Sequence, residues 1–385
     1  MQHVVVVGGG LAGARSVEEL RSQGYDGRIT LLAAEQHLPY DRPPLSKGLL
    51  VGDEDHVTLD VPWERLDVDL QLGVRACGLA EGRVLVEGGD LPYDGLVLAT
   101  GAQPLRLPGP GRTLRGVDDA RQLAEQLVPG ARIVIVGAGW IGGEVATVAQ
   151  QAGCQVTVLE AGAAPLAALP REVGGLAIPW YAGLGIDLRL GTKVEAVQER
   201  RVQLADGEVL AADVVLVAVG AAPDVGWLAD SGLELDHGIV VDEHLATEWP
   251  GVVAAGDCVA RWSPRYDCQL RVEHWDDALH GPTVAVATLL GTPAVYDPVP
   301  YFWSDQLGHT IQWAGFARGA TRVVKRGRPG GPEGWAFCWL AGPRLVAMLT
   351  VDRPRDLVQG RRRIAEGAEP DLRRLADPAV PVKSA

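Results

Sequence analysis

Short apolar runs and amphipathic stretches alternate along this chain. The β-branched run HVVVV, residues 3–7, leads into an amphipathic stretch and then into a second apolar run, RITLL at 28–32. Runs of this length and composition are typical of buried strands, and the stretch between them has helical spacing. The same order returns in residues 132–161. The pattern therefore predicts two strand–helix–strand units.

The repeat extends further along the chain. Residues 83–104 and 201–223 each contain a hairpin-like strand pair with a glycine turn, followed by a hydrophobic strand that ends in glycine, alanine and proline. An internal repeat of this size indicates two homologous domains rather than one. We therefore expect an α/β protein with two similar parallel sheets.

Each predicted unit has glycines at fixed positions between its first strand and its helix, and an acid after its second strand. Glycines at this spacing let a backbone approach a pyrophosphate at a helix N-terminus, and the acid binds ribose hydroxyls. Strand, glycines, helix, strand and acid together predict two dinucleotide sites, whereas isolated glycine turns would indicate little. The residues are Gly8, Gly10, Gly13 and Glu35 in the first unit, and Gly137, Gly139, Gly142 and Glu160 in the second.

A further short strand, within GVVAAGDCVA at 251–260, follows the second repeat and needs a sheet to join. If it completes the first domain, the second domain is inserted within the first. Asp257 would then present a carboxylate to a polyol such as the ribityl chain of a flavin. The alternative for Asp257 is a loop aspartate that caps a helix.

The segment PYDRPPLSKGLL, residues 39–50, is unusually rigid for a loop. Its prolines fix φ and remove backbone donors, so the segment is held in one shape outside helix and sheet. Asp41, Arg42 and Lys47 lie in it. A loop of this kind presents Lys47 in a fixed place; the alternative is an ordinary solvated loop lysine.

Composition excludes several classes of protein. A formal charge of −14 over 385 residues argues against nucleic acid as a partner. The five cysteines form no CxxC pair and have no zinc-like spacing, so we expect neither a metal site nor the cysteine pair of a disulfide reductase. No apolar stretch reaches the ~18 residues of a membrane span. A strand begins almost at the first residue, which leaves no room for a signal peptide, and we expect a cytoplasmic protein.

With these motifs, the chain resembles the NADH-dependent ferredoxin reductases typified by putidaredoxin reductase and the reductases of biphenyl-type dioxygenases. The distinctive matches are the PPLSK loop and FWSDQ at 302–306, and the resemblance extends over nearly the whole chain. It implies a glutathione-reductase-like flavoprotein with two Rossmann-like domains and a C-terminal α+β domain. The expected domains are FAD-binding at 1–115 and 246–298, NADH-binding at 116–245, and a C-terminal interface domain at 299–385.

The resemblance also implies particular residues for each cofactor. Lys47 is expected near the flavin, paired with Glu144, and these two are the candidate catalytic residues. Phe302, Trp303 and Asp305 are expected at the start of the C-terminal domain, where aromatic residues are equally consistent with ordinary core. The residues implied for FAD are Gly8, Gly10, Ala12, Gly13, Glu35, Arg42, Lys47, Ala76, Thr100, Gly101, Arg115, Asp257, Glu273, His274 and Trp275. Those implied for NADH are Gly137, Gly139, Trp140, Ile141, Gly142, Glu144, Glu160 and Gly220.

Three features depart from the family pattern. Ala34 stands where relatives commonly have an acid, with Glu35 next in line to replace it. Pro282 lies inside an expected helix, where it should kink or restart the helix because proline lacks the N–H that the helix needs. The loop after residue 52 is shorter than usual.

The function that follows is hydride transfer from NADH to FAD, and then single-electron transfer to a small iron–sulfur ferredoxin that serves a cytochrome P450 or a Rieske oxygenase. A rubredoxin reductase, a carrier-free NADH oxidase and a redox-sensing NADH-binding flavoprotein stay open as alternatives. We expect no membrane partner and a monomer or weak homodimer. The basic stretch at 317–331, with Arg318, Arg322, Lys325, Arg326 and Arg328, is either a docking face for the ferredoxin or a solvated hairpin rim.

Overall fold

The computed structural model describes residues 1–52 and 56–385, so part of the shortened loop after residue 52 lies outside the described residues. The chain forms two compact units, and two of its passages between them run through the short strands β8 (Ala102–Pro104) and β16 (Ala221–Pro223). Unit 1 comprises Met1–Asp41, His56–Gln103 and Ala222–Pro300; unit 2 comprises Arg42–Asp55, Pro104–Ala221 and Tyr301–Ala385.

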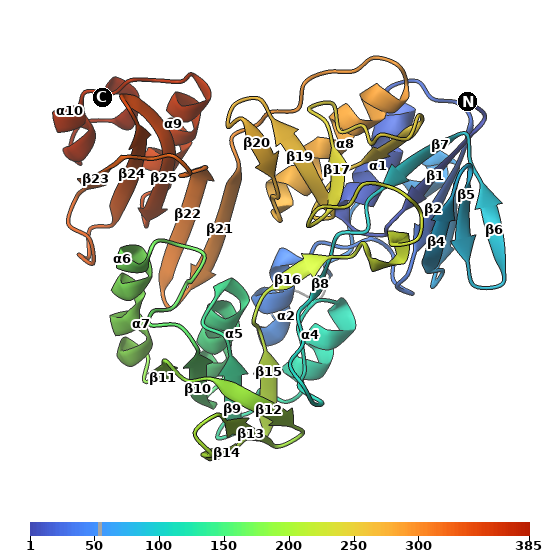
Figure 1. The fold of residues 1–385 in the computed structure, drawn as a ribbon. Coiled ribbons are helices and arrows are strands. Elements are labelled where there is room, and N and C mark those ends of the chain that lie inside the picture. The colour runs from blue at the N-terminus through green and yellow to red at the C-terminus, as the bar shows by residue number, and fades with distance from the viewer. Residues whose placement is uncertain (53–55) are drawn as a thin grey trace. The chain divides into compact units, whose positions relative to one another are not determined.

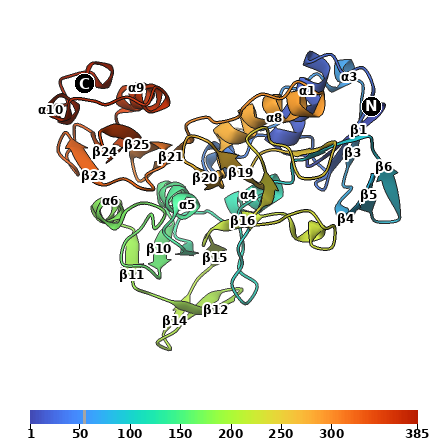
Figure 2. The same cartoon turned by 45° about the horizontal axis from the view of Figure 1, so that its top comes forward.

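Unit 1 is built on a five-stranded parallel sheet with the order β18-β7-β1-β2-β3. Its inner strands β7, β1 and β2 are mostly apolar, as the sequence pattern predicts, because helices and loops cover both faces of a parallel sheet. Helices α1 (Leu11–Ser22) and α8 (Trp275–Leu289) lie side by side on one face (Figures 1 and 2). The strands are β1 (His3–Val7), β2 (Arg28–Ala33), β3 (Val68–Leu72), β7 (Gly95–Leu98) and β18 (Val252–Ala254).

Two small sheets complete unit 1. The first is an antiparallel three-stranded sheet, and the second pairs β17 in parallel with β19 and β19 antiparallel with β20. The remaining elements are β4 (Ala76–Ala80), β5 (Arg83–Val86), β6 (Gly89–Pro92), β17 (Ile239–Val241), β19 (Val259–Ser263), β20 (Cys268–Leu270), α3 (Trp63–Leu66) and the 3-10 turn η3 (Gly226–Leu228).

Helix α8 runs unbroken through Pro282, so the expected restart at this proline is wrong. Pro282 removes a single N–H, and its ring is buried against the rest of unit 1. The next residue ties the helix to α1: the Thr283 hydroxyl donates to Glu19 at 3.0 Å, and the Thr283 carbonyl accepts from Gln23 at 3.0 Å. Packing against α1 therefore holds the helix together at the point where one backbone bond is lost.

Unit 2 contains the second copy of the fold. Its parallel sheet has the order β11-β10-β9-β15, with helix α5 (Trp140–Gln151) between β9 and β10 in the chain. The copy confirms the two-domain α/β prediction. Its strands are β9 (Arg132–Val136), β10 (Gln155–Glu160), β11 (Asp187–Leu190) and β15 (Val214–Val217), with an antiparallel sheet of β12 (Val194–Gln198), β13 (Arg201–Leu204) and β14 (Val209–Ala211).

Several short helices belong to the same unit. The proline-rich segment forms the 3-10 turn η1 and the single-turn helix α2, which lies against α4. The bounds are η1 (Pro43–Ser46), α2 (Gly48–Val51), α4 (Val117–Ala124), α6 (Arg171–Gly174), η2 (Gly175–Ala177) and α7 (Ile178–Gly183).

The C-terminal part of unit 2 is an antiparallel sheet with the order β21-β22-β25-β24-β23, followed by two helices. Its core includes Trp335, Phe337 and Trp339, and it is continuous with Leu166 and Val173 from the α6 region. The elements are β21 (Tyr301–Gln306), β22 (His309–Gly315), β23 (Arg322–Arg326), β24 (Trp335–Ala341), β25 (Arg344–Val351), α9 (Pro354–Ala365), α10 (Leu372–Ala376) and the 3-10 turn η4 (Val382–Ser384).

Among the described residues, no helix is both long enough and apolar enough to cross a bilayer.

Candidate functional site

The first glycine loop lies between β1 and α1, and each of its glycines is required for a different structural reason. Gly8 adopts φ +128°, and a Cβ there would lie 2.1 Å from the Ala99 carbonyl oxygen. A Cβ on Gly13 would lie 1.8 Å from the Gly8 oxygen, so this glycine lets α1 pack closely against the strand. Gly10, the N-cap of α1, has nothing within 4 Å of an added Cβ. That open space at a helix N-terminus fits a pyrophosphate.

The second loop, between β9 and α5, repeats this arrangement. Gly137 adopts φ +105°, with an added Cβ 2.3 Å from the Ala218 oxygen, and a Cβ on Gly142 would lie 2.0 Å from the Gly137 oxygen. Gly139 is the N-cap of α5 and again faces open space. The chain therefore has two cradles of the same design, and both fit a dinucleotide.

Each cradle has its acid at the end of the second strand. Glu160 closes β10, where its Oε2 accepts from the Ala138 N–H at 3.0 Å and its Oε1 from the Gly162 N–H at 2.7 Å. The carboxylate is thereby fixed beside the glycine loop. Glu35 follows β2 and accepts a hydrogen bond from the Tyr40 hydroxyl, whereas Ala34 is exposed.

The Gly256–Asp257 turn lies beside the start of α1. Its strand, β18, pairs with β7 in the sheet of unit 1, and a Cβ on Gly256 would lie 2.9 Å from the Cβ of Ala12. Asp257 thus belongs to the same end of the sheet as the first cradle. Carboxyl ends of parallel strands are where ligands bind in this class of fold.

Residues at the start of α8 were also expected to approach the flavin. His274 is the N-cap, and burial lowers the pKa of its imidazole, which favours the neutral ring. The Trp275 indole Nε1 donates to Asp41 Oδ1 at 2.7 Å, while Glu273 lies 3.5 Å from Arg271. The Trp275 bond fixes the end of the proline-rich segment that belongs to unit 1.

Several other expected cofactor residues follow strands of the two sheets. Thr100 and Gly101 come after β7, and the Thr100 hydroxyl donates to the Asp224 carbonyl at 2.8 Å. Gly220 comes after β15, and both glycines have positive φ, +71° for Gly101 and +117° for Gly220. Ala76 is buried on β4.

The expected pair of Lys47 and Glu144 is present within unit 2. Lys47 follows η1, and its Nζ lies 2.9 Å from Glu144 Oε2. Glu144 projects from α5, one turn after the second cradle, and is only 4% exposed. The rigid proline segment therefore brings an ammonium to a buried carboxylate, which a charge at that depth requires.

Two serines that sequence reasoning missed complete the surroundings of Glu144. The Ser46 hydroxyl donates to Oε2, and the Ser304 hydroxyl donates to Oε1 at 2.6 Å. Both serines are buried, and each lies in one of the two distinctive motifs, PPLSK and FWSDQ. The signal that points to them is the carboxylate itself, because a buried carboxylate needs several hydrogen-bond donors.

Other predicted residues of unit 2 also lie near one another. Trp140, the first residue of α5, makes an edge contact with Phe302 at 4.7 Å between ring centroids. The Arg42 guanidinium donates to the Arg115 carbonyl at 2.5 Å. Ile141 is 40% exposed beside the second cradle. Arg42, Lys47 and Arg115 belong to unit 2, whereas the other residues expected for FAD belong to unit 1.

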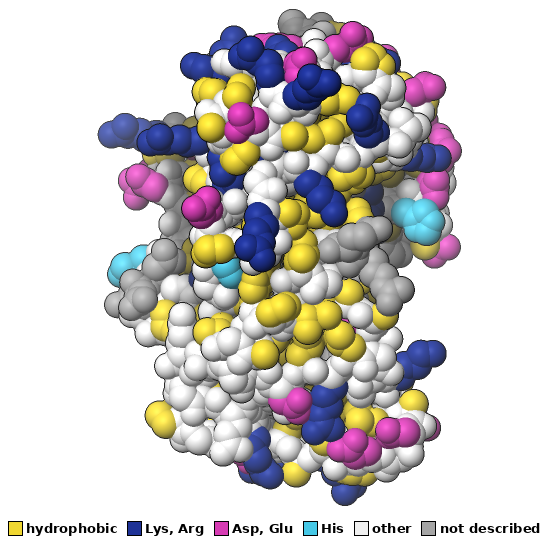
Figure 3. Space-filling model, turned by 90° about the vertical axis from the view of Figure 1, so that its left-hand side faces the viewer, with side chains coloured by type: hydrophobic (Ala, Val, Ile, Leu, Met, Phe, Trp, Pro, Cys, Tyr) yellow, Lys and Arg dark blue, Asp and Glu magenta, His cyan; other side chains and the backbone are white. Residues whose placement is uncertain are grey.

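The basic stretch 317–331 does not form a continuous surface. Arg322 and Lys325 are exposed and alternate on β23 as expected, but Arg326 is buried and bound to Asp356, so its expected place on the surface is wrong. Residues 301–385 hold 14 Lys and Arg against 8 Asp and Glu, a net charge of +6 in a chain of −14. Figure 3 shows Lys and Arg side chains gathered over the upper part of the face that it displays.

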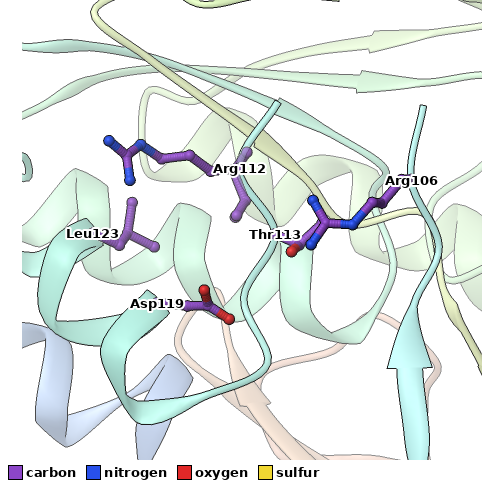
Figure 4. A pocket seen from close by; sticks show the side chains of 6 residues that line it. Arg106, Arg112, Thr113, Asp119 and Leu123 are labelled. Atoms are coloured by element: carbon purple, nitrogen blue, oxygen red, sulfur yellow. The ribbon is translucent and has the colours of Figure 1, made fainter. Parts of the chain in front are cut away.

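A small hollow of about 120 Å³ lies between β15, α4 and the segment that precedes α4. It contains none of the expected site residues. Figure 4 shows the Arg106 side chain beside Thr113. The Arg112 side chain points away from Arg106, and it donates to Gln122 at 3.1 Å. Asp119, on its wall, accepts from the backbone N–H groups of residues 115 and 116 and so caps α4. Its residues are Arg106, Arg112, Thr113, Asp119, Leu123 and Leu216.

No cysteine is disulfide-bonded, and Cys258 directly follows Asp257. All five are free, and Cys258 and Cys338 are buried, with burial raising the pKa of each thiol, to about 11 and about 12. A raised pKa makes a thiol a poor nucleophile at neutral pH. Within 1–52 and 56–385, no three His, Cys, Asp or Glu residues are grouped as metal ligands would be.

Two sheets of one design, each with a glycine cradle at a helix N-terminus, define a protein that binds two dinucleotides. Comparison with known families agrees: residues 2–281 match the pyridine nucleotide-disulphide oxidoreductase family, and residues 301–385 match the reductase C-terminal family. The chain belongs to the pyridine nucleotide-disulphide oxidoreductases, with the C-terminal domain of the reductases. Proteins of this family use FAD and NAD(H).

Full-length relatives are ferredoxin reductases. The chain is 38% identical to the anthranilate 1,2-dioxygenase system ferredoxin–NAD(+) reductase component of Burkholderia cepacia, over 99% of this chain and 98% of the relative. It is 34% identical to putidaredoxin reductase of Pseudomonas putida, over 99% and 96%. The crystal structure of Fdr9 matches with a TM-score of 0.94, 50% identity and 99% coverage of both chains. Putidaredoxin reductase in its covalent complex with putidaredoxin matches with a TM-score of 0.93, 32% identity and coverage of 99% and 97%.

Proposed function

We propose that this protein takes electrons from NADH and passes them through FAD to a small iron–sulfur ferredoxin that serves an oxygenase, of the cytochrome P450 or Rieske type. The observation that carries the proposal is the duplicated cradle in a chain whose five cysteines are all unpaired. Two dinucleotide sites provide an electron input, and the lack of a CxxC pair removes a disulfide as the next carrier.

The residues divide between the cofactors as follows. We assign FAD to 1–115 and 246–298, with the pyrophosphate at Gly10 and the ribityl chain at Asp257, and NADH to 116–245, with the pyrophosphate at Gly139 and the adenosine ribose at Glu160. FAD, when bound, accepts a hydride from NADH and releases its two electrons singly. The chain's own part is to bind and orient both groups and to place the charge of Lys47. No side chain has to move a proton in the hydride step.

The remaining part, residues 299–385, is assigned to the partner. Its positive charge contrasts with the acidic remainder of the chain, which supports contact with an acidic protein. We also propose that the protein works in the cytoplasm, as a monomer or weak homodimer.

The competing functions differ in where the electrons go. A carrier-free NADH oxidase passes them to oxygen, a rubredoxin reductase passes them to rubredoxin, and a sensor passes few electrons on. The name of the matching family includes disulfide reduction, but that chemistry needs a redox-active cysteine pair, and this sequence has no closely spaced pair.

The test is a turnover assay with purified protein reconstituted with FAD. We expect one non-covalent FAD per chain, released on denaturation, and NADH-dependent cytochrome c reduction that requires an added [2Fe–2S] ferredoxin. A rubredoxin and air-saturated buffer without a carrier serve as the two comparison acceptors. Failure to bind FAD, or equal turnover with and without every carrier, contradicts the proposal.

A further inference from the structure

The carboxylate of Glu144 is held by three donors from two separate parts of the chain. Oε2 receives the Lys47 ammonium at 2.9 Å and the Ser46 hydroxyl, both from the proline-rich segment. Oε1 receives the Ser304 hydroxyl, at 2.6 Å, from strand β21. Because Glu144 is almost fully buried, these donors replace the water that an exposed carboxylate would have.

The direction of the Ser304 hydroxyl is itself fixed. Gln306 Nε2 donates to Ser304 Oγ at 2.9 Å, so the hydroxyl accepts from Gln306 and has its proton available for Glu144. Gln306 reaches this position across Gly143, where an added Cβ would lie 1.9 Å from the amide oxygen. Because Gly143, the second glycine of the GGE sequence in α5, has no side chain, the Gln306 amide can occupy the space beside it.

Strand β21 is attached to α5 on both sides of this contact. The Phe302 ring meets Trp140 at the start of the helix, and the Leu307 N–H donates to the Thr147 hydroxyl at 2.7 Å. Ser304 lies between these two attachments, next to Glu144. Such a framework fixes a side chain closely, because neither strand nor helix can shift alone.

We propose that Ser46 and Ser304 are positioning residues that hold Glu144, and through it the Lys47 ammonium, in the place needed for reduction of the flavin by NADH. This inference rests on the proposed function and deepens it. The two hydroxyls keep the carboxylate charged and stationary without adding charge of their own. Lys47 then has one site at which its ammonium is paired, on the side of Glu144 that Ser304 leaves free.

Loss of either hydroxyl should weaken the positioning of Glu144 and thereby slow flavin reduction. A hydrogen bond to a charged group contributes about 1.5–3 kcal/mol, which corresponds to roughly ten- to a hundredfold in a rate or equilibrium constant. We expect Ser304→Ala and Ser46→Ala each to lower the limiting rate of flavin reduction at saturating NADH by about tenfold, with FAD still bound. Stopped-flow spectroscopy of the reductive half-reaction measures this rate.

A matched control comes from the same sheet. Thr350 lies on β25, is fully buried, and its hydroxyl has no hydrogen-bond partner in the described part of the chain. Thr350→Val therefore removes a buried hydroxyl that makes no hydrogen bond within the described residues, and we expect flavin reduction at the wild-type rate. Gly143→Ala acts from the other end, since it displaces Gln306, and it should resemble Ser304→Ala.

A second readout does not depend on activity. Between Arg28 and Arg65, trypsin has only two possible cleavage positions, and Arg42 is protected because Pro43 follows it. Cleavage after Lys47 therefore reports release of the lysine from Glu144. We expect the holoprotein variants Ser46→Ala and Ser304→Ala to be cleaved at this bond at least several times faster than wild type and Thr350→Val, as followed by fragment mass.

The double variant Ser304→Ala/Glu144→Ala decides whether the serine acts through the carboxylate. If it does, adding Ser304→Ala to Glu144→Ala slows flavin reduction little beyond the effect of Glu144→Ala alone. Independent, multiplicative losses would make Ser304 a structural residue and overturn the inference, as would wild-type rates and wild-type trypsin cleavage in both serine variants. If NADH does not reduce the wild-type flavin, the proposed function is refuted instead. The trypsin cleavage rates then still test whether the two serines hold Lys47 on Glu144.

Discussion

The guanidinium of Arg326 forms a two-point ion pair with the carboxylate of Asp356, with Nε 2.8 Å from Oδ2 and Nη2 3.2 Å from Oδ1. The same guanidinium donates to the carbonyls of Leu375, Asp377 and Val380 in the C-terminal tail. Arg326 is 1% exposed. It therefore anchors α9 and the tail to β23, and it is not part of a docking surface.

The first prediction concerns this anchor. Arg326→Met removes the two-point partner of Asp356, which keeps its ion pair with Arg353, and it leaves the buried tail carbonyls without their donor. Leaving buried acceptors unsatisfied usually costs about 1–3 kcal/mol. We expect the urea midpoint of the C-terminal sheet, followed by tryptophan fluorescence, to fall sharply. Arg322→Met on the exposed part of the same strand is the control and should change little. Equal midpoints for the two variants would contradict the anchoring role.

The second prediction concerns ferredoxin docking. Arg322 and Lys325 stay exposed on β23, and Lys325 lies over the ring of Phe337 with Nζ 6.0 Å from its centroid. We expect Arg322→Glu/Lys325→Glu to reduce ferredoxin-dependent cytochrome c reduction and to weaken its dependence on salt, because charge complementarity mainly raises the association rate. NADH–ferricyanide activity serves as the control and should be preserved. Full carrier-dependent turnover at low salt would show that the ferredoxin docks elsewhere.

The third prediction concerns Lys47. Lys47→Ala leaves Glu144 with its two serine donors and, among the described residues, without an ion-pair partner. The protein should therefore keep FAD but be reduced by NADH more slowly, by about tenfold or more. Rapid-mixing reduction measured beside flavin content separates the two effects. Lys47→Arg retains the charge and should recover part of the rate. Unchanged kinetics in Lys47→Ala and Glu144→Ala would make the pair a structural feature only.

The fourth prediction concerns the choice of nucleotide. Glu160 is fixed by the N–H groups of Ala138 and Gly162, so its charge stays where the adenosine ribose is expected. A carboxylate there disfavours a 2′-phosphate, and the AGAAP sequence that follows offers no arginine for one. We expect a clear preference for NADH over NADPH in kcat/KM, reduced in Glu160→Ala and partly retained in Glu160→Gln. Equal values for both nucleotides in the wild type would refute the assignment.

The fifth prediction concerns Asp277, in the first turn of α8. Burial raises the pKa of its carboxyl to about 6, against the attraction of Arg261 (Nε–Oδ1 3.7 Å) and a hydrogen bond from the Tyr296 hydroxyl at 3.1 Å, and with repulsion from Asp257 and Asp276. Between pH 4 and 6 the folded protein then holds a proton that the unfolded chain has lost.

This contribution to stability is full at about pH 4, falls as the pH rises to about 6, and is constant above that. The wild type should therefore lose stability relative to Asp277→Asn over this interval, by up to about 2 kcal/mol. Thermal melting of both proteins from pH 4.5 to 7.5 measures the difference. A difference that does not vary with pH would contradict the assignment to Asp277.

The fold was readable from the sequence because its signals are local. Glycine spacing, helical and strand periodicity, and an acid at the end of a strand each lie within about thirty residues, and each appears twice. The strand at 252–254 was found differently, as an apolar run with no nearby partner. Pro282 shows the limit of such rules, because helix α1, far away in sequence, keeps α8 continuous.

The site was less readable where its contacts are distant. Strand alternation correctly separates Arg322 from Lys325, but only Asp356 and the tail carbonyls determine that Arg326 is buried. Ser304 meets Glu144 across 160 residues of sequence. Nothing within FWSDQ distinguishes this serine from a surface residue until a buried carboxylate is placed beside it.

The pairing of β18 with β7 also has a consequence during synthesis on the ribosome. Strand β7 ends at Leu98, but β18, the Asp257 turn and helix α8 emerge only after the whole second fold has been translated. At about 5–20 residues per second, the first sheet waits on the order of ten to thirty seconds with one edge open. The nascent chain must therefore complete its second nucleotide fold before its first, although the first begins at the N-terminus.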